Sequence, residues 1–176
     1  MKLVKPYTFI LALFLLVGFG IPKGVQKRVK KEVEKTFEVA DFTMDSITVP
    51  NELNEVLPTK ISGSNLYRVN DTNSLLGYVF VDQAPSKTAK FDYLVVFDHD
   101  LKVINSKVLI YREEYGGEIG SKRWLKQFLG KTGGDRVNCE TNIDAISGAT
   151  ISVQSMTKSM DNLFQTIGIL QEKGKL

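Results

Sequence analysis

Apolar positions in the last quarter of the chain repeat every three or four residues. Between Ile151 and Leu170, the residues at this spacing are Val153, Met156, Met160, Leu163, Phe164 and Ile167. Such a period is typical of an amphipathic helix with one buried face. The pattern therefore predicts a long C-terminal helix that begins just after two small residues, Gly148 and Ala149.

Runs of branched and aromatic residues earlier in the chain predict strands. The three longest runs are 75–81, 91–97 and 102–111, and shorter ones are 46–49 and 66–69. Runs bounded by turn residues favour an antiparallel sheet. A polar loop containing Pro85 is expected at 83–90, and a hairpin turn at 98–100. One face of the sheet is expected to pack against the C-terminal helix, which gives an α+β domain.

Two further helices are expected. Val25, Val29, Val33 and Phe37 form an apolar stripe in 24–40, and lysines and glutamates lie between them. Such a basic amphipathic helix would pack on the domain or face a membrane, with its charged side in solvent. Residues 121–130 predict a short helix capped by Ser121 and ended by Gly130, and 51–56 predicts a single helical turn.

Composition narrows the possible functions. The chain has 176 residues, a net charge of +3 and 43% hydrophobic residues, which suit one globular domain plus a short appendage. This charge gives no sign of a nucleic-acid partner. The single cysteine, Cys139, excludes an internal disulfide and a thiolate zinc cluster. The single histidine, His99, lies in the expected hairpin turn, so no metal site is predicted.

The heptapeptide 144–150, Asp-Ala-Ile-Ser-Gly-Ala-Thr, lies where a loop turns into the C-terminal helix. The unpaired N–H groups and the positive dipole end of a helix start favour a phosphate group. Gly148 and Ala149 would allow that phosphate to approach the backbone closely. The alternative is an ordinary helix cap, in which the hydroxyl of Ser147 or Thr150 accepts a hydrogen bond from a backbone N–H.

The whole heptapeptide resembles the flavinylation motif of the FMN-binding domain family. This family includes the FMN-carrying subunits of the sodium-pumping NADH:quinone reductase and of the Rnf electron-transport complex. The resemblance extends over about residues 75–170, through a strand, a glycine-containing loop and a tryptophan helix. It implies that a separate flavin transferase, with FAD as donor, esterifies Thr150 to the phosphate of FMN.

The other candidate cofactor-binding residues come from the heptapeptide and from the loop and helix before it. They are Asp144, Ser147, Gly148 and Ala149, with Glu114, Tyr115, Gly117 and Trp124 as candidates for contacts with the flavin ring. Where the family often has Glu-Thr-Pro-Gly-Leu-Gly, residues 114–120 read Glu-Tyr-Gly-Gly-Glu-Ile-Gly. Trp124 could equally fill the core, and Glu114 could be a solvated carboxylate. Asp144 could orient the loop or assist the transferase.

The start of the chain predicts export. Lys2 and Lys5 precede an apolar run at 7–21, so 1–22 is interpreted as a signal peptide or a membrane anchor. Basic residues at 23–31 instead favour a cytoplasmic flank or contact with an anionic lipid surface. The resemblance implies an extracytoplasmic location, and this interpretation is adopted. The expected organisation is 1–22 as signal or anchor, 23–40 as the basic helix and 41–176 as the FMN-binding domain.

These features together predict an electron carrier rather than an enzyme with its own substrate. The sequence has no Rossmann glycine pattern and no second cofactor motif, so redox chemistry would come from the flavin. The expected partners are the flavin transferase and electron-transfer proteins of the membrane. The alternatives are a small flavin-dependent reductase of a soluble acceptor, a protein that binds FMN without a covalent bond, and a scaffold without flavin.

Overall fold

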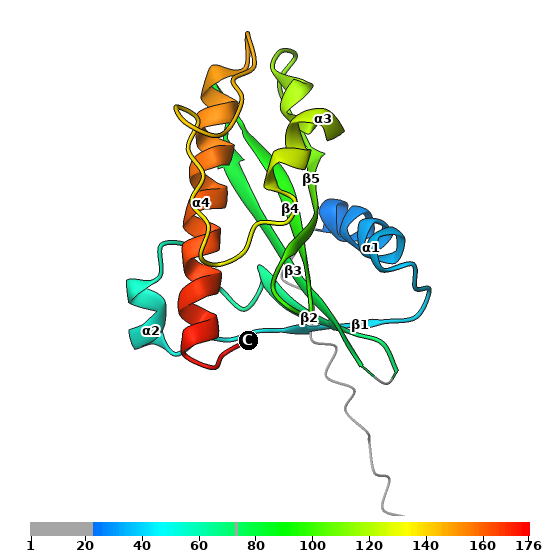
Figure 1. Cartoon of the computed structure of the whole chain (residues 1–176). Helices are drawn as coiled ribbons and strands as arrows, with labels where there is room; N and C mark the ends of the chain where they lie inside the picture. Colours follow the sequence, from blue (N-terminus) through cyan, green and yellow to red (C-terminus); the bar gives the residue numbers. More distant parts are fainter. Residues whose placement is uncertain (1–22, 73) are drawn as a thin grey trace, which may run out of the picture.

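One antiparallel sheet forms the centre of the structure (Figure 1), a computed structural model that describes residues 23–72 and 74–176. Its strands are β1 (Thr43–Ser46), β2 (Leu66–Asn70), β3 (Leu75–Pro85), β4 (Lys90–Asp98) and β5 (Val103–Ile110). Their spatial order is their chain order, and each strand pairs with its sequence neighbour. β1 and β5 are therefore the two edge strands.

The long helix α4 (Thr150–Glu172) covers one face of this sheet (Figure 1). All six residues of the predicted apolar stripe are buried: Val153, Met156, Met160, Leu163, Phe164 and Ile167. They share a hydrophobic core with sheet residues such as Phe80, Tyr93 and Val95. The predicted C-terminal helix and the predicted α+β class are thereby confirmed.

Helix α1 (Lys23–Phe37) covers the opposite face of the sheet (Figure 1). Val25, Val29 and Val33 are at most 2% exposed, and they pack in a second core that includes Val79 and Val96. The apolar stripe of this helix is thus used for packing on the domain. The helix ends at Phe37, three residues before the predicted end.

The strand boundaries correct two predictions. β3 continues to Pro85 and β4 begins at Lys90, so the loop between them is 86–89 rather than 83–90. Gln83 belongs to the strand, where it pairs with Asp92 and donates a side-chain hydrogen bond to its carboxylate at 2.8 Å. Polar residues on the exposed side of a strand produced the loop-like pattern. β1 lies at 43–46 rather than 46–49, because 43–46 pairs with 67–70.

Three of the short helices lie near their predicted positions: α2 (Asn51–Val56), α3 (Lys122–Leu125) and η2 (Lys126–Phe128). The fourth, η1 (Gly117–Gly120), lies in the segment that the sequence predicted as a glycine-containing loop. The Ser121 hydroxyl accepts a hydrogen bond from the backbone N–H of Trp124, which confirms the predicted cap. Gly130 has a φ of +78°, which allows the chain to turn away after η2.

The described residues, 23–72 and 74–176, contain no helix long and apolar enough to span a membrane. The predicted signal or anchor at 1–22 lies outside these residues.

Candidate functional site

Thr150 is the first residue of α4, and it is exposed. Gly148, two residues earlier, has a φ of +81°, a conformation that glycine adopts without steric penalty. No side chain caps the helix, and the hydroxyls of Ser147 and Thr150 have no hydrogen-bond partner among the described residues. The helix-cap alternative is thus not observed, and the Thr150 hydroxyl is exposed and unpaired among the described residues.

The backbone N–H groups at the start of α4 also lack partners in the part of the chain that the structure describes. The first intrahelical hydrogen bond runs from the N–H of Val153 to the carbonyl of Ala149, at 2.9 Å. The N–H groups of Thr150, Ile151 and Ser152 precede it and have no protein acceptor. Unpaired N–H groups with the positive end of a 23-residue helix dipole suit an anion such as a phosphate ester.

A pocket of about 660 Å³ opens in front of Thr150. Three segments line it: Lys87 and Thr88 from the turn between β3 and β4, residues 111–115 after β5, and residues 148–152 at the start of α4. Two of its side chains are exposed apolar groups: Tyr115 is 75% exposed and Ile151 is 48% exposed. Exposed apolar surface beside an exposed hydroxyl would suit a planar aromatic ligand.

Glu113 fixes the turn between β3 and β4 over this pocket. One carboxylate oxygen, Oε1, accepts four hydrogen bonds: from the Ser86 hydroxyl at 2.7 Å, from the Thr88 N–H and hydroxyl at 2.6 and 3.2 Å, and from the Ala89 N–H at 3.1 Å. These hydrogen bonds, with that of the Thr88 N–H foremost, lower the pKa of Glu113 to about 2. Glu113 is therefore ionised throughout the physiological range and holds Lys87 and Thr88 in place.

Tyr111 ties the loop after β5 to the first turn of α4. Its hydroxyl donates to the Tyr115 carbonyl at 3.0 Å and shares a 3.0 Å hydrogen bond with the Ser152 hydroxyl. Gly116 has a φ of +85°, and a Cβ at that position would lie 2.7 Å from the Tyr111 hydroxyl oxygen. Only glycine allows this loop to pass so close to Tyr111.

The charged groups of the pocket differ in their partners. Arg112 pairs with the buried carboxylate of Asp92 and donates to the Lys90 carbonyl at 2.7 Å. The side chains of Lys87 and Glu114, by contrast, have no partner among the described residues. Lys87 is thus the pocket cation that remains available to a bound phosphate.

Trp124 and Asp144 lie at a second, smaller pocket of about 370 Å³. Trp124 is 4% exposed, packs edge-on against Phe128 and donates its indole N–H to the Asp144 carbonyl at 2.7 Å. The Asp144 N–H donates to the Gln127 side chain at 2.8 Å. Trp124 is therefore a core residue that holds the beginning of the heptapeptide, and it does not line the Thr150 pocket.

The structure brings together only some of the residues singled out from the sequence. Gly148, Ala149, Thr150, Glu114 and Tyr115 line the larger pocket. Asp144, Ser147, Gly117 and Trp124 do not, and their role toward a cofactor stays a prediction. The carboxylate of Asp144 accepts no hydrogen bond in the described part of the chain, so any orienting effect there comes from its backbone.

Sequence reasoning missed seven residues that line the pocket: Lys87, Thr88, Tyr111, Arg112, Glu113, Ile151 and Ser152. Tyr111 and Ile151 were assigned to a strand and to a helix, where an apolar residue needs no further explanation. Glu113 precedes Glu114, and no spacing rule separates a carboxylate that anchors a turn from one in solvent. For Lys87, the only sequence feature that could have indicated a role in the pocket was the polar composition of the turn around it.

In residues 23–72 and 74–176, no cluster of three or more histidine, cysteine or acidic side chains could hold a metal ion.

The larger pocket thus places an exposed threonine hydroxyl, unpaired among the described residues, at an uncapped helix start beside an exposed aromatic side chain. Residues 87–165 match the family model described as FMN-binding domain. The resemblance seen in the sequence is thereby confirmed. The matched segment includes every residue that lines the Thr150 pocket.

Among solved structures, the crystal structure of Shewanella oneidensis NqrC is similar, with a TM-score of 0.56 and 14% sequence identity. The match covers 86% of this chain and 99% of that chain. At this identity the similarity shows a shared fold. A comparison with curated protein sequences gave no match.

Proposed function

We propose that the chain is an electron carrier that holds FMN through a phosphoester bond to Thr150. The observation that carries this proposal is the unpartnered Thr150 hydroxyl, at the uncapped start of α4, inside the segment that matches the FMN-binding domain. The similarity in fold to NqrC, an FMN-carrying subunit, supports the same role.

The residues of the larger pocket fit each part of FMN. The free N–H groups of the first turn of α4 and the ammonium group of Lys87 would hold the phosphate. The exposed faces of Tyr115 and Ile151 would hold the isoalloxazine ring. Bound FMN would supply the redox chemistry, and the chain would supply attachment, orientation and electrostatics.

Attachment follows from the exposed position of Thr150. The threonine oxygen, Oγ1, forms a bond to the FMN-side phosphorus of FAD, while the pyrophosphate bond of FAD breaks and AMP leaves. The hydroxyl proton passes to a base of the flavin transferase or to water. The base would come from outside this chain, because the Thr150 hydroxyl has no hydrogen-bond partner among the described residues.

A carrier fits the pocket better than an enzyme with its own substrate. Four of the residues that line the pocket are exposed to solvent: Glu114, Tyr115, Thr150 and Ile151. A ring held there would be accessible to another protein, which suits electron transfer between partners. Turnover of a soluble acceptor by the isolated flavinylated chain would favour the reductase alternative instead.

The first experiment measures the intact mass of the denatured chain after incubation with FAD, with and without a flavin transferase. We expect a transferase-dependent gain of one FMN less water, mapped to the peptide that contains Thr150. Thr150→Ala should abolish this gain while the free energy of unfolding changes by less than about 1 kcal/mol, the usual range for an exposed residue.

Ser147→Ala is the matched control, because Ser147 is an exposed hydroxyl of the same heptapeptide outside the pocket. It should keep the mass gain. Covalent flavin that persists in Thr150→Ala would refute the attachment site. Flavin that copurifies but is released by denaturation would instead indicate non-covalent binding, and a folded chain without any flavin would indicate a scaffold.

We further propose that the domain lies outside the cytoplasm and exchanges electrons with membrane proteins. The support is the sequence pattern of Lys2 and Lys5 followed by the apolar run at 7–21. Protease added to intact cells whose outer barrier has been opened should degrade the domain. A domain that stays protected until the cytoplasmic membrane is lysed would contradict this location.

A further inference from the structure

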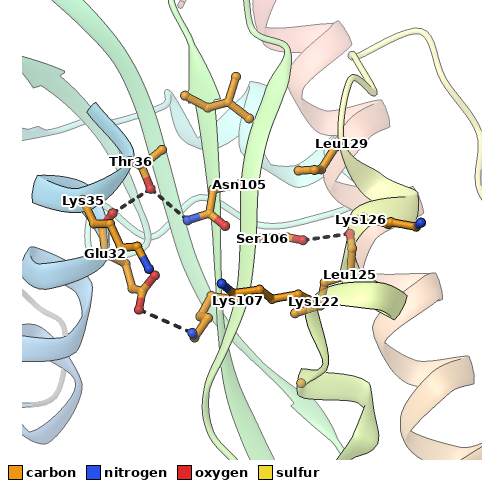
Figure 2. Close-up of a pocket in the computed structure, with 12 residues that line it drawn as sticks. Glu32, Lys35, Thr36, Asn105, Ser106, Lys107, Lys122, Leu125, Lys126 and Leu129 are labelled. Carbon is orange, nitrogen blue, oxygen red and sulfur yellow. Dashed lines mark hydrogen bonds and ion pairs between the residues drawn. The ribbon is translucent and has the colours of Figure 1, made fainter. Parts of the chain in front are cut away.

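A groove of about 440 Å³ lies along the edge strand β5, between α1 on one side and α3 with η2 on the other (Figure 2). It shares no lining residue with the Thr150 pocket. Four consecutive strand residues, 104–107, line it. Because alternate residues of a strand point to opposite faces, one cavity that touches four in a row must open along the edge of the strand.

The backbone of β5 is available along this groove. At one end, Val103 pairs with the loop after η2: its N–H donates to the Lys131 carbonyl at 2.9 Å and its carbonyl accepts from the Gly130 N–H at 2.8 Å. At the other end, the Leu109 carbonyl accepts from Arg28 at 3.0 Å. Between them, in the described structure, the backbone of 104–108 has no hydrogen bonds outside its pairing with β4.

The side chains around this edge are basic and apolar. Figure 2 shows Lys35 and Glu32 on α1, Lys107 on β5, and Lys122 and Lys126 on the opposite wall. Only Lys107 has an ion-pair partner among the described residues, Glu32 at 3.5 Å, so the groove carries a net charge of +3 from four lysines and one glutamate.

Two aliphatic side chains in the same groove face solvent. Ile104 is 36% exposed and Leu129 is 46% exposed. The floor between them is fixed, because Asn105 donates to the Thr36 hydroxyl at 2.8 Å and the Ser106 hydroxyl donates to the Leu125 carbonyl at 3.2 Å (Figure 2). A preformed groove needs little ordering when a partner binds.

We propose that this groove binds an extended, acidic segment of a partner protein, which adds to the sheet as a strand beside β5. The free backbone groups of 104–108 would pair with about five residues of that segment. Its apolar side chains would contact Ile104 and Leu129, and its carboxylates would face the lysines.

Two other occupants fit these observations less well. A second copy of this chain paired through the same edge would bring lysines against lysines, and edge lysines prevent such pairing. An anionic membrane would meet the lysines but would offer no strand to the backbone of 104–108. A peptide-binding experiment distinguishes the acidic segment from a second copy and from a membrane.

The probe is a capped hexapeptide of alternating leucine and glutamate, added to the full chain without flavin. We expect saturable binding that weakens as salt is added, with the largest amide chemical-shift changes at 104–107. A Lys122→Glu/Lys126→Glu double variant should bind at least about tenfold more weakly, because charge reversal at a rim opposes an acidic partner. Both residues are exposed, so the fold should be unchanged.

Lys175→Glu is the matched control: it reverses an exposed lysine outside the groove and should change affinity by less than about twofold. A peptide methylated on alternate backbone nitrogens keeps its charge but cannot pair as a strand, so it should not bind. The proposal is overturned if that peptide or a leucine–lysine peptide binds equally well. Amide chemical-shift changes at 104–107 that only anionic vesicles cause would overturn the proposal in favour of a membrane. Changes that only self-association causes would overturn it in favour of a second copy.

Discussion

Replacing Gly116 with alanine would test how the loop after β5 is held against α4. The backbone φ of +85° costs an alanine about 1 kcal/mol. The new Cβ would lie 2.7 Å from the Tyr111 hydroxyl oxygen, so the tyrosine must move. Movement breaks its hydrogen bonds to Ser152 and to the Tyr115 carbonyl, worth about 0.5–1.5 kcal/mol each. We therefore expect the free energy of unfolding to fall by about 2–4 kcal/mol.

Two other variants separate these contributions. Gly130→Ala has a similar φ of +78° but no atom within 4 Å of its Cβ, so it should lose only about 1 kcal/mol. Tyr111→Phe should lose about 1–3 kcal/mol through the same two hydrogen bonds. In the Gly116→Ala/Tyr111→Phe double variant, the clashing oxygen is gone. Its loss should be about 2–4 kcal/mol, below the additive sum of about 3–7 kcal/mol.

The assay is equilibrium unfolding in urea, with the free energy extrapolated to water and the slope compared between variants. If the slope of the unfolding free energy against urea concentration is unchanged, the variant has changed the stability of the fold and not the compactness of the denatured state. Additive losses in the double variant, or equal losses in Gly116→Ala and Gly130→Ala, would show that the contact with Tyr111 does not constrain this loop.

Three further predictions concern the segments that hold the site. The pKa of Glu113 is about 2, below its ordinary 4.5, so its ionised form stabilises the fold above that ordinary value, and the contribution disappears as the pH falls toward 2. The stability difference between the native chain and Glu113→Gln, measured by urea unfolding, should thus be constant near neutral pH and shrink below about pH 4.5; a constant difference down to pH 2 would contradict it. Arg136→Ala should destabilise the chain by about 1–3 kcal/mol, because the buried Asp161 carboxylate loses the hydrogen bonds that Arg136 donates at 2.8 and 3.0 Å. Thermal unfolding measures this loss, and an unchanged midpoint would show that this ion pair does not stabilise the fold. Trp124→Phe keeps the ring packing but loses the hydrogen bond to the Asp144 carbonyl, so flavin attachment, followed by intact mass, should slow without being abolished; a complete loss would make Trp124 part of the site.

The elements that follow a strict hydrophobic period were predictable from the sequence. α4 (Thr150–Glu172) contains the whole periodic segment 151–170, because burial at every third or fourth position identifies the helix and its inward face. The end of β3 was not predictable in this way. Its last residues, Asp82 to Pro85, include two polar residues and a proline, and they belong to the sheet through their pairing with β4.

The site was predictable as a motif and not as a pocket. The resemblance of the heptapeptide to the flavinylation motif pointed to Thr150, whereas its small residues and hydroxyls alone indicated either a helix cap or a helix start that favours a phosphate. Lys87 and Glu113 reach the pocket through the sheet, from 63 and 37 positions earlier in the chain, and no local pattern relates residues so far apart. Trp124 was an ambiguous candidate, because core packing and ligand contact favour the same residue type.

The packing of α1 has a consequence for what counts as the domain. Val25, Val29 and Val33 seal a sheet face that includes Val79 and Val96. A chain shortened to 41–176, the boundary expected from the sequence, would expose that face to water and offer it for non-specific association. We therefore expect that a stable unit must include α1, although the segment that matches the family model starts only at residue 87.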